Sequence, residues 1–222
     1  MSKSKRLSLR LDRPPTAPDL APSLDRLPCD ALEDDCLLEN GLVQGHDFSG
    51  RALADLAFKG VHLKHANLAG TRLERFEAWD TLFEGCDLSN ADWSQCRLER
   101  VLCVDCRLTG LRANEATLQD ARFKGCRADL AQFRMARFRY CRMEACVLRS
   151  ADFQAASLPG AAFAGCQLQE AQFSQADLRG ADFTEAEIDG IGINPEAMRG
   201  MKVSPRQAAL LASKLGLDVR WD

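Results

Sequence analysis

A large apolar residue returns at every fifth position over most of the chain. Stepping by five from Leu38 to Val203 gives 34 positions, and every one of them is apolar. We name this position the centre of each five-residue unit. The stretch 151–190 shows the unit most clearly, as ADFQA ASLPG AAFAG CQLQE AQFSQ ADLRG ADFTE AEIDG. Neither the helical period of 3.6 nor the strand period of 2 matches this spacing, so amphipathic helices and ordinary hairpins are excluded.

The position two residues before each centre also points inward. It holds mostly Ala or Cys, and over residues 36–193 Arg51 is the only Asp, Glu, Lys or Arg at either inward position. Two inward residues in every five fit a four-walled coil of 20 residues, in which residues 20 apart stack at about 4.8 Å. We therefore expect a ladder of Phe133, Phe153 and Phe173. Where a centre shrinks to Ala78, its inward partner is the larger Phe76, as tight packing requires.

Glycine recurs two residues after the centre, where we expect the chain to turn a corner. No insertion breaks the register from residue 53 to 193. This pattern resembles the pentapeptide-repeat family over residues 36–203. The resemblance implies an all-β fold, a right-handed quadrilateral β-helix, with a C-terminal capping helix and short strand. Three parts are expected: a basic tail and Pro-rich linker or cap (1–35), the repeat solenoid (36–203), and a helix–strand cap and dimerisation module (204–222).

The N-terminal part allows more than one interpretation. Residues 1–13 carry five Lys or Arg and form either a solvated tail or a docking arm. Residues 14–28 contain five prolines, which suits an extended linker or a cap. His46 and Arg51 occupy inward positions, so we expect a first coil that is distorted or covered by the N-terminal segment.

The C-terminal part changes period. Ser204 and Gln207 form a capping box around Pro205, which predicts a helix, and the alternation over 217–221 predicts a short strand. The apolar face of this module can close the rod or pack against a second copy. The candidate dimer interface consists of Ala208, Leu211, Ala212, Leu215, Val219 and Trp221.

This module also carries a second resemblance, to the C-terminal module of the Qnr quinolone-resistance proteins and the related MfpA and AlbG. It rests on residues 200–203, 207–211 and 215–219. The resemblance implies a head-to-head homodimer that resembles B-form DNA in size and charge. It also implies binding to DNA gyrase or topoisomerase IV and protection of that enzyme from quinolones or topoisomerase-poisoning toxins. The unbroken register lacks the long loops of Qnr proteins and is closer to the MfpA type.

Charge is distributed unevenly, although the net charge is only −3. Residues 150–197 hold eight acids and one base, and a protein that mimics DNA needs outward carboxylates of this kind. The candidate gyrase-facing surface consists of Asp152, Asp177, Asp182, Glu185, Glu187 and Asp189. Residues 97–149 instead hold eleven Arg and Lys124 against six acids. This Arg-rich middle keeps an alternative open, a non-catalytic protein- or nucleic-acid-binding scaffold unrelated to topoisomerases.

Catalysis is not expected, because a filled coil leaves no interior pocket. Nine of the ten Cys fall on inward positions, including both members of the Cys103–Cys106 pair, where Cys acts as a small apolar residue rather than a zinc or redox ligand. His62 and His65 point outward and suit a solvated surface better than a metal site. We expect no metal, cofactor, small-molecule substrate or membrane segment, and free thiols favour the cytoplasm.

Overall fold

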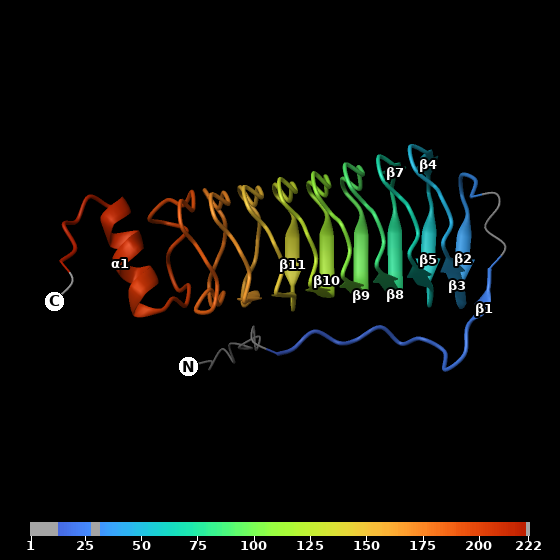
Figure 1. The fold of residues 1–222 in the computed structure, drawn as a ribbon, viewed down its shortest axis with the longest axis horizontal. Helices are drawn as coiled ribbons and strands as arrows, with labels where there is room; N and C mark the ends of the chain where they lie inside the picture. The colour runs from blue at the N-terminus through green and yellow to red at the C-terminus, as the bar shows by residue number, and fades with distance from the viewer. Residues whose placement is uncertain (1–12, 28–31, 221–222) are drawn as a thin grey trace, which may run out of the picture.

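The structure is a computed structural model that describes residues 13–27 and 32–220. The basic tail up to residue 12 and Trp221 of the candidate dimer interface lie outside these residues. The described chain forms a parallel β-solenoid in which each coil pairs with the next (Figure 1). The register is 20 residues throughout the regular coils, as in Phe83↔Cys103 and Phe123↔Met143. The predicted four-walled solenoid is therefore confirmed.

Strands form mainly on two of the four walls, and the other two walls are built from turns joined by isolated bridges. The main sheet runs in the order β1-β3-β6-β8-β9-β10-β12-β13, with β2, β5 and β11 beside it, and β4 pairs with β7 separately. The strands are β1 (Asp25–Arg26), β2 (Leu37–Glu39), β3 (Gly41–Gln44), β4 (Ala52–Ala54), β5 (Ala57–Lys59), β6 (His62–Lys64), β7 (Arg72–Glu74), β8 (Glu77–Glu84), β9 (Arg97–Val104), β10 (Thr117–Lys124), β11 (Arg137–Arg139), β12 (Arg142–Glu144) and β13 (Ala162–Ala164).

A residue with positive φ stands at corner after corner, two residues after the centre. Glycine takes many of these corners, as predicted, but 20 residues other than glycine take the same conformation. Asp80, Asp120 and Tyr140 are three of them, with φ of 48°, 54° and 55°. A left-handed residue that is not glycine costs about 1–2 kcal/mol, so the ladder of backbone hydrogen bonds on both sides must hold these corners in place.

The core is one continuous column of inward side chains. Phe133, Phe153 and Phe173 stack with ring centroids 5.1 and 4.8 Å apart, which confirms the predicted ladder. Phe76 and Ala78 are both 0% exposed, so the larger residue does fill the space that the smaller one leaves. Close stacking of this kind adds to the free energy gained by burying the rings.

The N-terminal segment covers the first coil, as expected. β1 pairs with β3, so β-structure begins before residue 36, where the repeat register starts. The Leu27 side chain lies 2.3 Å from where a Cβ on Gly41 would stand, so only glycine fits beneath it. Arg51, at an inward position near the start of the rod, is half-buried, and its guanidinium lies 5.5 Å from the centroid of the Phe48 ring.

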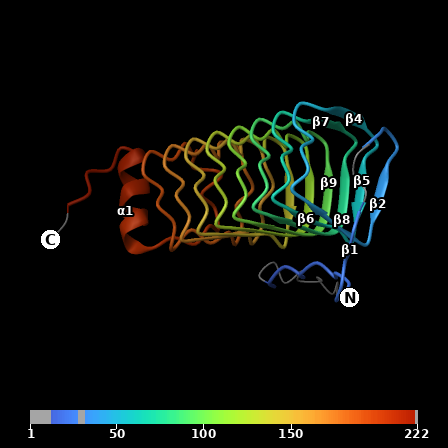
Figure 2. The same cartoon turned by 45° about the vertical axis from the view of Figure 1, so that its right-hand side comes forward.

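Residues 13–24 run along the outside of the rod, from its middle to its N-terminal end, where they lead into β1 (Figures 1 and 2). We name them the arm. Its half-buried side chains face the rod, and they are Pro15, Pro18, Leu20 and Leu24. Residues 14–24 fall in the stretch expected to be an extended linker or a cap, and they run as an extended segment along the rod, whereas the tail or docking arm of residues 1–13 lies outside the described residues except for Arg13. The arm has no strand of its own, so it is held by side chains at the corners that it crosses.

The C-terminal end is closed by α1 (Pro205–Lys214), which lies across the last coil (Figure 1). The predicted capping box is present: Gln207 N–H donates to Ser204 Oγ at 3.4 Å, and Ser204 N–H donates to Gln207 Oε1 at 2.8 Å. The strand predicted at 217–221 is wrong for residues 217–220, which are irregular. Leu217 is 61% exposed, and no strand of the described chain lies beside it to pair with.

Candidate functional site

Three of the six predicted acidic residues have a structural role. Asp152, Asp177 and Asp182 each accept a hydrogen bond from the backbone N–H two residues later, at 2.9, 3.3 and 3.0 Å. Such bonds stabilise turns. The same bond recurs at the other end of the rod, at Asp47, Asp87 and Asp92. These carboxylates therefore shape turns whether or not anything binds outside.

Two of these carboxylates are also partly neutralised by neighbours. Hydrogen bonds from Arg179, whose Nη2 lies 2.6 Å from Oδ2, lower the pKa of Asp177. Burial alone would raise the pKa of Asp182, but hydrogen bonds from Thr184 and the charge of Lys202 outweigh it and lower the pKa. Both groups are ionised at neutral pH, but the charge of Asp177 is compensated locally.

The structure brings four of the six predicted residues together. Asp182 and Glu185 lie on one wall, and Glu187 and Asp189 lie on the next wall of the last coil. We name these four residues the acidic edge. Asp152 and Asp177 belong to ladders on the other two walls. An open groove of about 330 Å³ separates part of the edge from α1 and is lined by Glu185, Glu187, Asp189, Arg206 and Gln207, among others.

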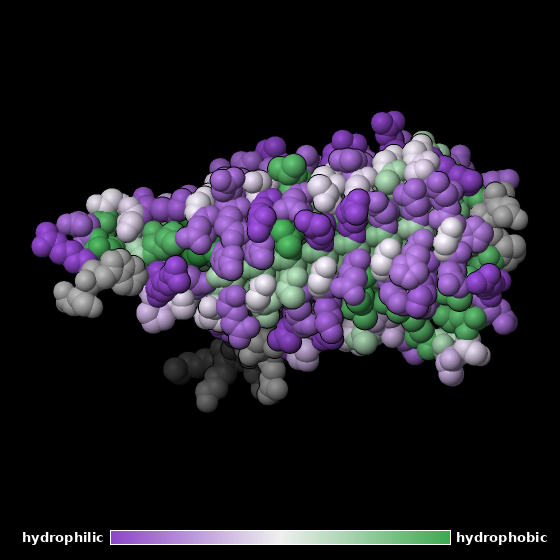
Figure 3. Space-filling model, viewed as in Figure 1, coloured by the Kyte–Doolittle hydropathy of each residue, from purple (hydrophilic) through white to green (hydrophobic). Residues whose placement is uncertain are grey.

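The helix beside this edge uses its apolar residues in two ways. Leu211 is 6% exposed and packs into the core of its own chain, so its assignment to a dimer interface is wrong. Leu215 is 52% exposed and Leu217, which the sequence analysis did not select, is 61% exposed. Figure 3 shows apolar atoms on the viewed face of this cap. We name the outward apolar residues the cap stripe: Ala208, Ala212, Leu215, Leu217 and Val219.

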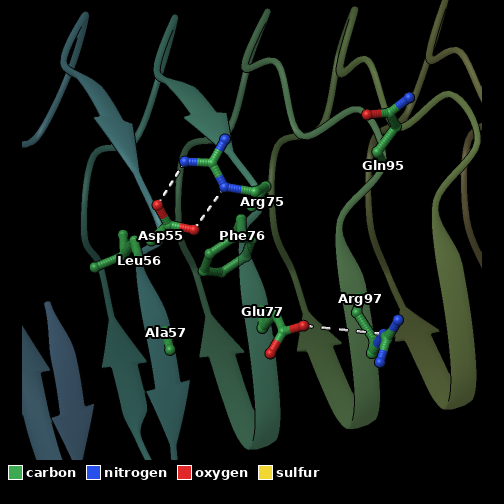
Figure 4. A pocket seen from close by; sticks show the side chains of 8 residues that line it. All are labelled: Asp55, Leu56, Ala57, Arg75, Phe76, Glu77, Gln95 and Arg97. Carbon is green, nitrogen blue, oxygen red and sulfur yellow. Dashed lines mark hydrogen bonds and ion pairs between the residues drawn. The ribbon is translucent and has the colours of Figure 1, made fainter. Parts of the chain in front are cut away.

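The surface also has open grooves between coils. One of about 440 Å³ is shown in Figure 4. Its floor includes Phe76, which is 0% exposed. Arg75 pairs with Asp55 at 2.5 Å, and Arg97 lies 4.0 Å from Glu77. The groove thus offers paired charges rather than an acid, a base and a nucleophile that converge on one point.

The cysteines described by the structure pack as small apolar residues. Cys103 and Cys106 are 3% and 1% exposed, in line with their inward positions. Burial raises the pKa of Cys96 and of Cys141 to about 12, so these thiols are neutral at physiological pH. No group of three or more His, Cys, Asp or Glu in the described part of the chain could hold a metal ion. His62 Nε2 instead lies 2.9 Å from Glu84 Oε2.

Sequence reasoning missed the groups that hold the arm. They are Arg13 on the arm and Asp120 and Tyr140 on the rod, more than a hundred residues away in the chain. A signal was present: Asp120 and Tyr140 stand at corner positions of one ladder, 20 residues apart. Nothing in the repeat, however, says which ladder an N-terminal arm will follow.

A closed β-solenoid with a solvated exterior defines a class of proteins that act through their outer surface. The chain matches the family described as "Pentapeptide repeat region" over residues 78–136 and 123–193. These ranges cover more than half of its 222 residues, and the protein belongs to this family. None of the curated proteins matches it.

Several solved structures share the fold. HetL, a pentapeptide-repeat protein of the cyanobacterium Nostoc sp. strain PCC 7120 involved in heterocyst differentiation regulation, is 20% identical, with a TM-score of 0.48 over 76% of this chain and 87% of HetL. Trypsin-treated QnrB1, a plasmid-mediated fluoroquinolone resistance protein, is 20% identical, with a TM-score of 0.33 over 83% of this chain and 99% of that one. Rfr23 of the cyanobacterium Cyanothece 51142 is 16% identical, with a TM-score of 0.22 over 77% of this chain and 90% of that one. These similarities concern the fold alone.

The single helix of the described residues has 10 residues, too few to cross a membrane.

Proposed function

We propose that the protein is a non-catalytic binding rod that pairs end to end through its cap and presents its acidic edge to a basic, DNA-binding surface. The partner that we propose is DNA gyrase or topoisomerase IV, which the resemblance of the C-terminal module implies. The supporting observation is that the acidic edge lies beside α1, the helix that carries part of the cap stripe, at the same end of the rod. We propose that the protein acts in the cytoplasm and that the cell benefits because a topoisomerase trapped on DNA by a drug or toxin is released.

Charge spacing supports this choice of partner. B-form DNA carries one negative charge per about 1.7 Å of its axis. A single acidic edge is short, because one coil rises about 4.8 Å. Pairing of two cap stripes would place two acidic edges on either side of the two-fold axis and so double the length of the acidic section. The proposal therefore needs the dimer as well as the carboxylates.

The dimer is tested by replacing exposed residues of the cap stripe. Because Leu211 belongs to the core, the informative variant is Leu215→Asp with Leu217→Asp. We expect light scattering to report a dimer for the parent and a monomer for this variant, with unchanged circular dichroism. Ser213→Asp, an exposed change on the same helix, should remain dimeric. A monomeric parent would refute end-to-end pairing.

The partner is tested with purified DNA gyrase and topoisomerase IV in supercoiling and decatenation assays, with and without a quinolone or a peptide toxin. We expect inhibition, or rescue from the poison, at micromolar protein. Glu185→Gln, Glu187→Gln and Asp189→Asn together should abolish the effect. The matched triple change Glu33→Gln, Glu39→Gln and Glu74→Gln, at the opposite end, should not. Absence of any effect from the parent would leave the scaffold without a topoisomerase role as the better account.

A further inference from the structure

The arm is fastened to the rod by one compact set of contacts, which we name the clasp. The Arg13 guanidinium pairs with Asp120, with Nη1 2.6 Å from Oδ1 and Nη2 2.9 Å from Oδ2. The same guanidinium lies 3.6 Å from the centroid of the Tyr140 ring. Thr16 N–H donates to Asp120 Oδ1 at 2.9 Å, and Asp19 N–H donates to Asp80 Oδ1 at 3.0 Å. Asp120 is only 4% exposed as a result.

The clasp delivers the arm to the most basic part of the rod. Arg137 and Arg139 lie on β11, just before the corner at Tyr140, and the Arg139 guanidinium lies 5.2 Å from the centroid of the Tyr140 ring. Arg122 and Arg142 are direct neighbours in the ladder between β10 and β12. These two arginines share a single carboxylate, Glu144, at 3.9 and 3.7 Å.

The positive charge at this corner is not balanced. Among the described residues, neither Arg137 nor Arg139 forms a salt bridge, and Arg137 and Arg139 are both exposed. In the described chain, Arg13, Arg122 and Arg142 form salt bridges only with Asp120 and Glu144, and Arg142 also lines a groove with Asp182 and Glu185.

Placing several arginines side by side costs repulsion unless an anion lies between them. We propose that the clasp assembles a binding site for the phosphate backbone of nucleic acid, formed by Arg13, Arg122, Arg137, Arg139 and Arg142 around Tyr140. Arg137 and Arg139 suit this ligand best because they are exposed and a guanidinium can bind a phosphate through two parallel N–H groups, whereas Arg13 is already bound to Asp120 and positions the arm. Binding of the backbone alone does not depend on base sequence. The proposal is independent of the topoisomerase partner, because it uses the basic coils around Tyr140 and the opposite charge, although Arg122 and Arg142 share their wall with Asp182.

The test uses the full chain and a fluorescein-labelled 20-nucleotide single strand and a 20-base-pair duplex, followed by anisotropy at increasing salt. We expect binding in about 50 mM salt that weakens as salt rises, with a log–log slope of about −2 to −4 for three to five phosphates. Arg137→Glu with Arg139→Glu should weaken binding at least about tenfold. Arg127→Glu with Arg149→Glu makes the same change of charge on the wall half a coil away and should weaken it much less.

A second pair of variants tests the clasp. Arg13→Ala should weaken binding more than Arg26→Ala, which removes one cation from β1, where Arg26 donates to Gln44. Circular dichroism checks that all variants keep the fold. Equal losses from the two double variants would overturn the proposal in favour of diffuse charge attraction. No binding at about 50 mM salt, or binding to phosphatidylserine vesicles but not to either oligonucleotide, would also overturn it.

Discussion

At the N-terminal end of the rod, another stretch of backbone forms hydrogen bonds with the first coil. At the C-terminal end, a single side chain forms the hydrogen bonds with the last coil. β1 pairs with β3, and Leu27 N–H donates to Leu42 O at 2.9 Å. At the other end Gln207 Nε2 donates to Phe183 O at 2.6 Å and to Ala186 O at 2.7 Å. In a regular coil, a carbonyl at the position of Ala186 accepts the N–H of the residue 21 later, as Cys166 O does from Glu187 N, whereas Phe183 O also accepts from Ala186 N–H at 2.8 Å within its own turn.

The difference shows what limits the length of a solenoid. Each coil contacts only its neighbours, so backbone groups lack partners only at the two ends. At the N-terminal end, β1 supplies hydrogen-bond partners for β3 but exposes a strand edge of its own, because the arm runs along the rod and does not cover that edge. The helix α1, whose Gln207 side chain bonds to the last coil, ends the ladder of backbone hydrogen bonds because a helix offers no strand edge. The end closed by α1 should therefore depend on fewer atoms and be easier to break by one substitution.

The largest effect on the free energy of unfolding is expected in the middle of the rod, at Phe153, which belongs to neither end. Its ring is 0% exposed and stacks on Phe133 and Phe173. Phe153→Ala should lower the free energy of unfolding by about 3–5 kcal/mol, because it removes buried surface and leaves a cavity. Denaturant unfolding measures this loss. Gln154→Ala, the next residue on the outside, should change it by less than about 0.5 kcal/mol. A loss below about 1 kcal/mol at Phe153 would contradict a tightly packed column.

The next effect is expected at the C-terminal end. Gln207→Leu keeps the approximate size but removes the donor of Ala186 O, while Phe183 O keeps its bond from Ala186 N–H. A buried group left unpaired costs about 1–3 kcal/mol. We expect a loss of about 1–3 kcal/mol and faster amide exchange in the last coil, measured by hydrogen exchange. Arg206→Leu, an exposed neighbour in the same turn, is the control and should change neither quantity. An unchanged last coil in Gln207→Leu would show that helix packing alone closes this end.

The sequence predicted the middle of the rod better than its ends, and the reason is physical. A five-residue period leaves only one arrangement in which Phe133, Phe153 and Phe173 can all be buried, so pattern alone determined the register. The C-terminal cap is a single helix without a repeat, so its sequence pattern predicted the helix but not how the helix packs on the rod. Its capping box was readable at Ser204 and Gln207, but the contact of Gln207 with Phe183 O depends on how the helix lies across the coil.

The candidate surfaces were predictable only in part. The five-residue repeat predicted which carboxylates point outward, and the four carboxylates of the acidic edge lie together at one end of the rod. It did not tell that Leu211 faces inward while Leu217 is exposed, since helical spacing alone cannot say which apolar stripe meets the rod. The clasp between Arg13 and Asp120 joins residues 107 apart, and no periodic signal relates them.

The smallest effect is expected at the arm, which completes the N-terminal cover through partly exposed contacts worth about 1 kcal/mol. Burial alone would raise the pKa of Asp120, but hydrogen bonds from Arg13 and Thr16 outweigh it and hold the pKa below its ordinary 3.8. Because the docked pKa is the lower one, docking is fully stabilised above about pH 4 and is lost as pH falls through the lowered value. Asp80 changes with the same sign, since hydrogen bonds from Arg100 lower its pKa.

Tyr140 is the only tyrosine of the chain, so one ring signal in an NMR spectrum reports directly on the Arg13 contact. On acidification from about pH 7 to about pH 2.5, this signal should move to the position that it has in Arg13→Ala at neutral pH. Asp120→Asn carries no titrating carboxylate at the clasp, so its Tyr140 signal should stay constant over the same range. If both proteins showed the same transition, the change would come from general acid unfolding, and the cover at the N-terminal end would not depend on this ion pair.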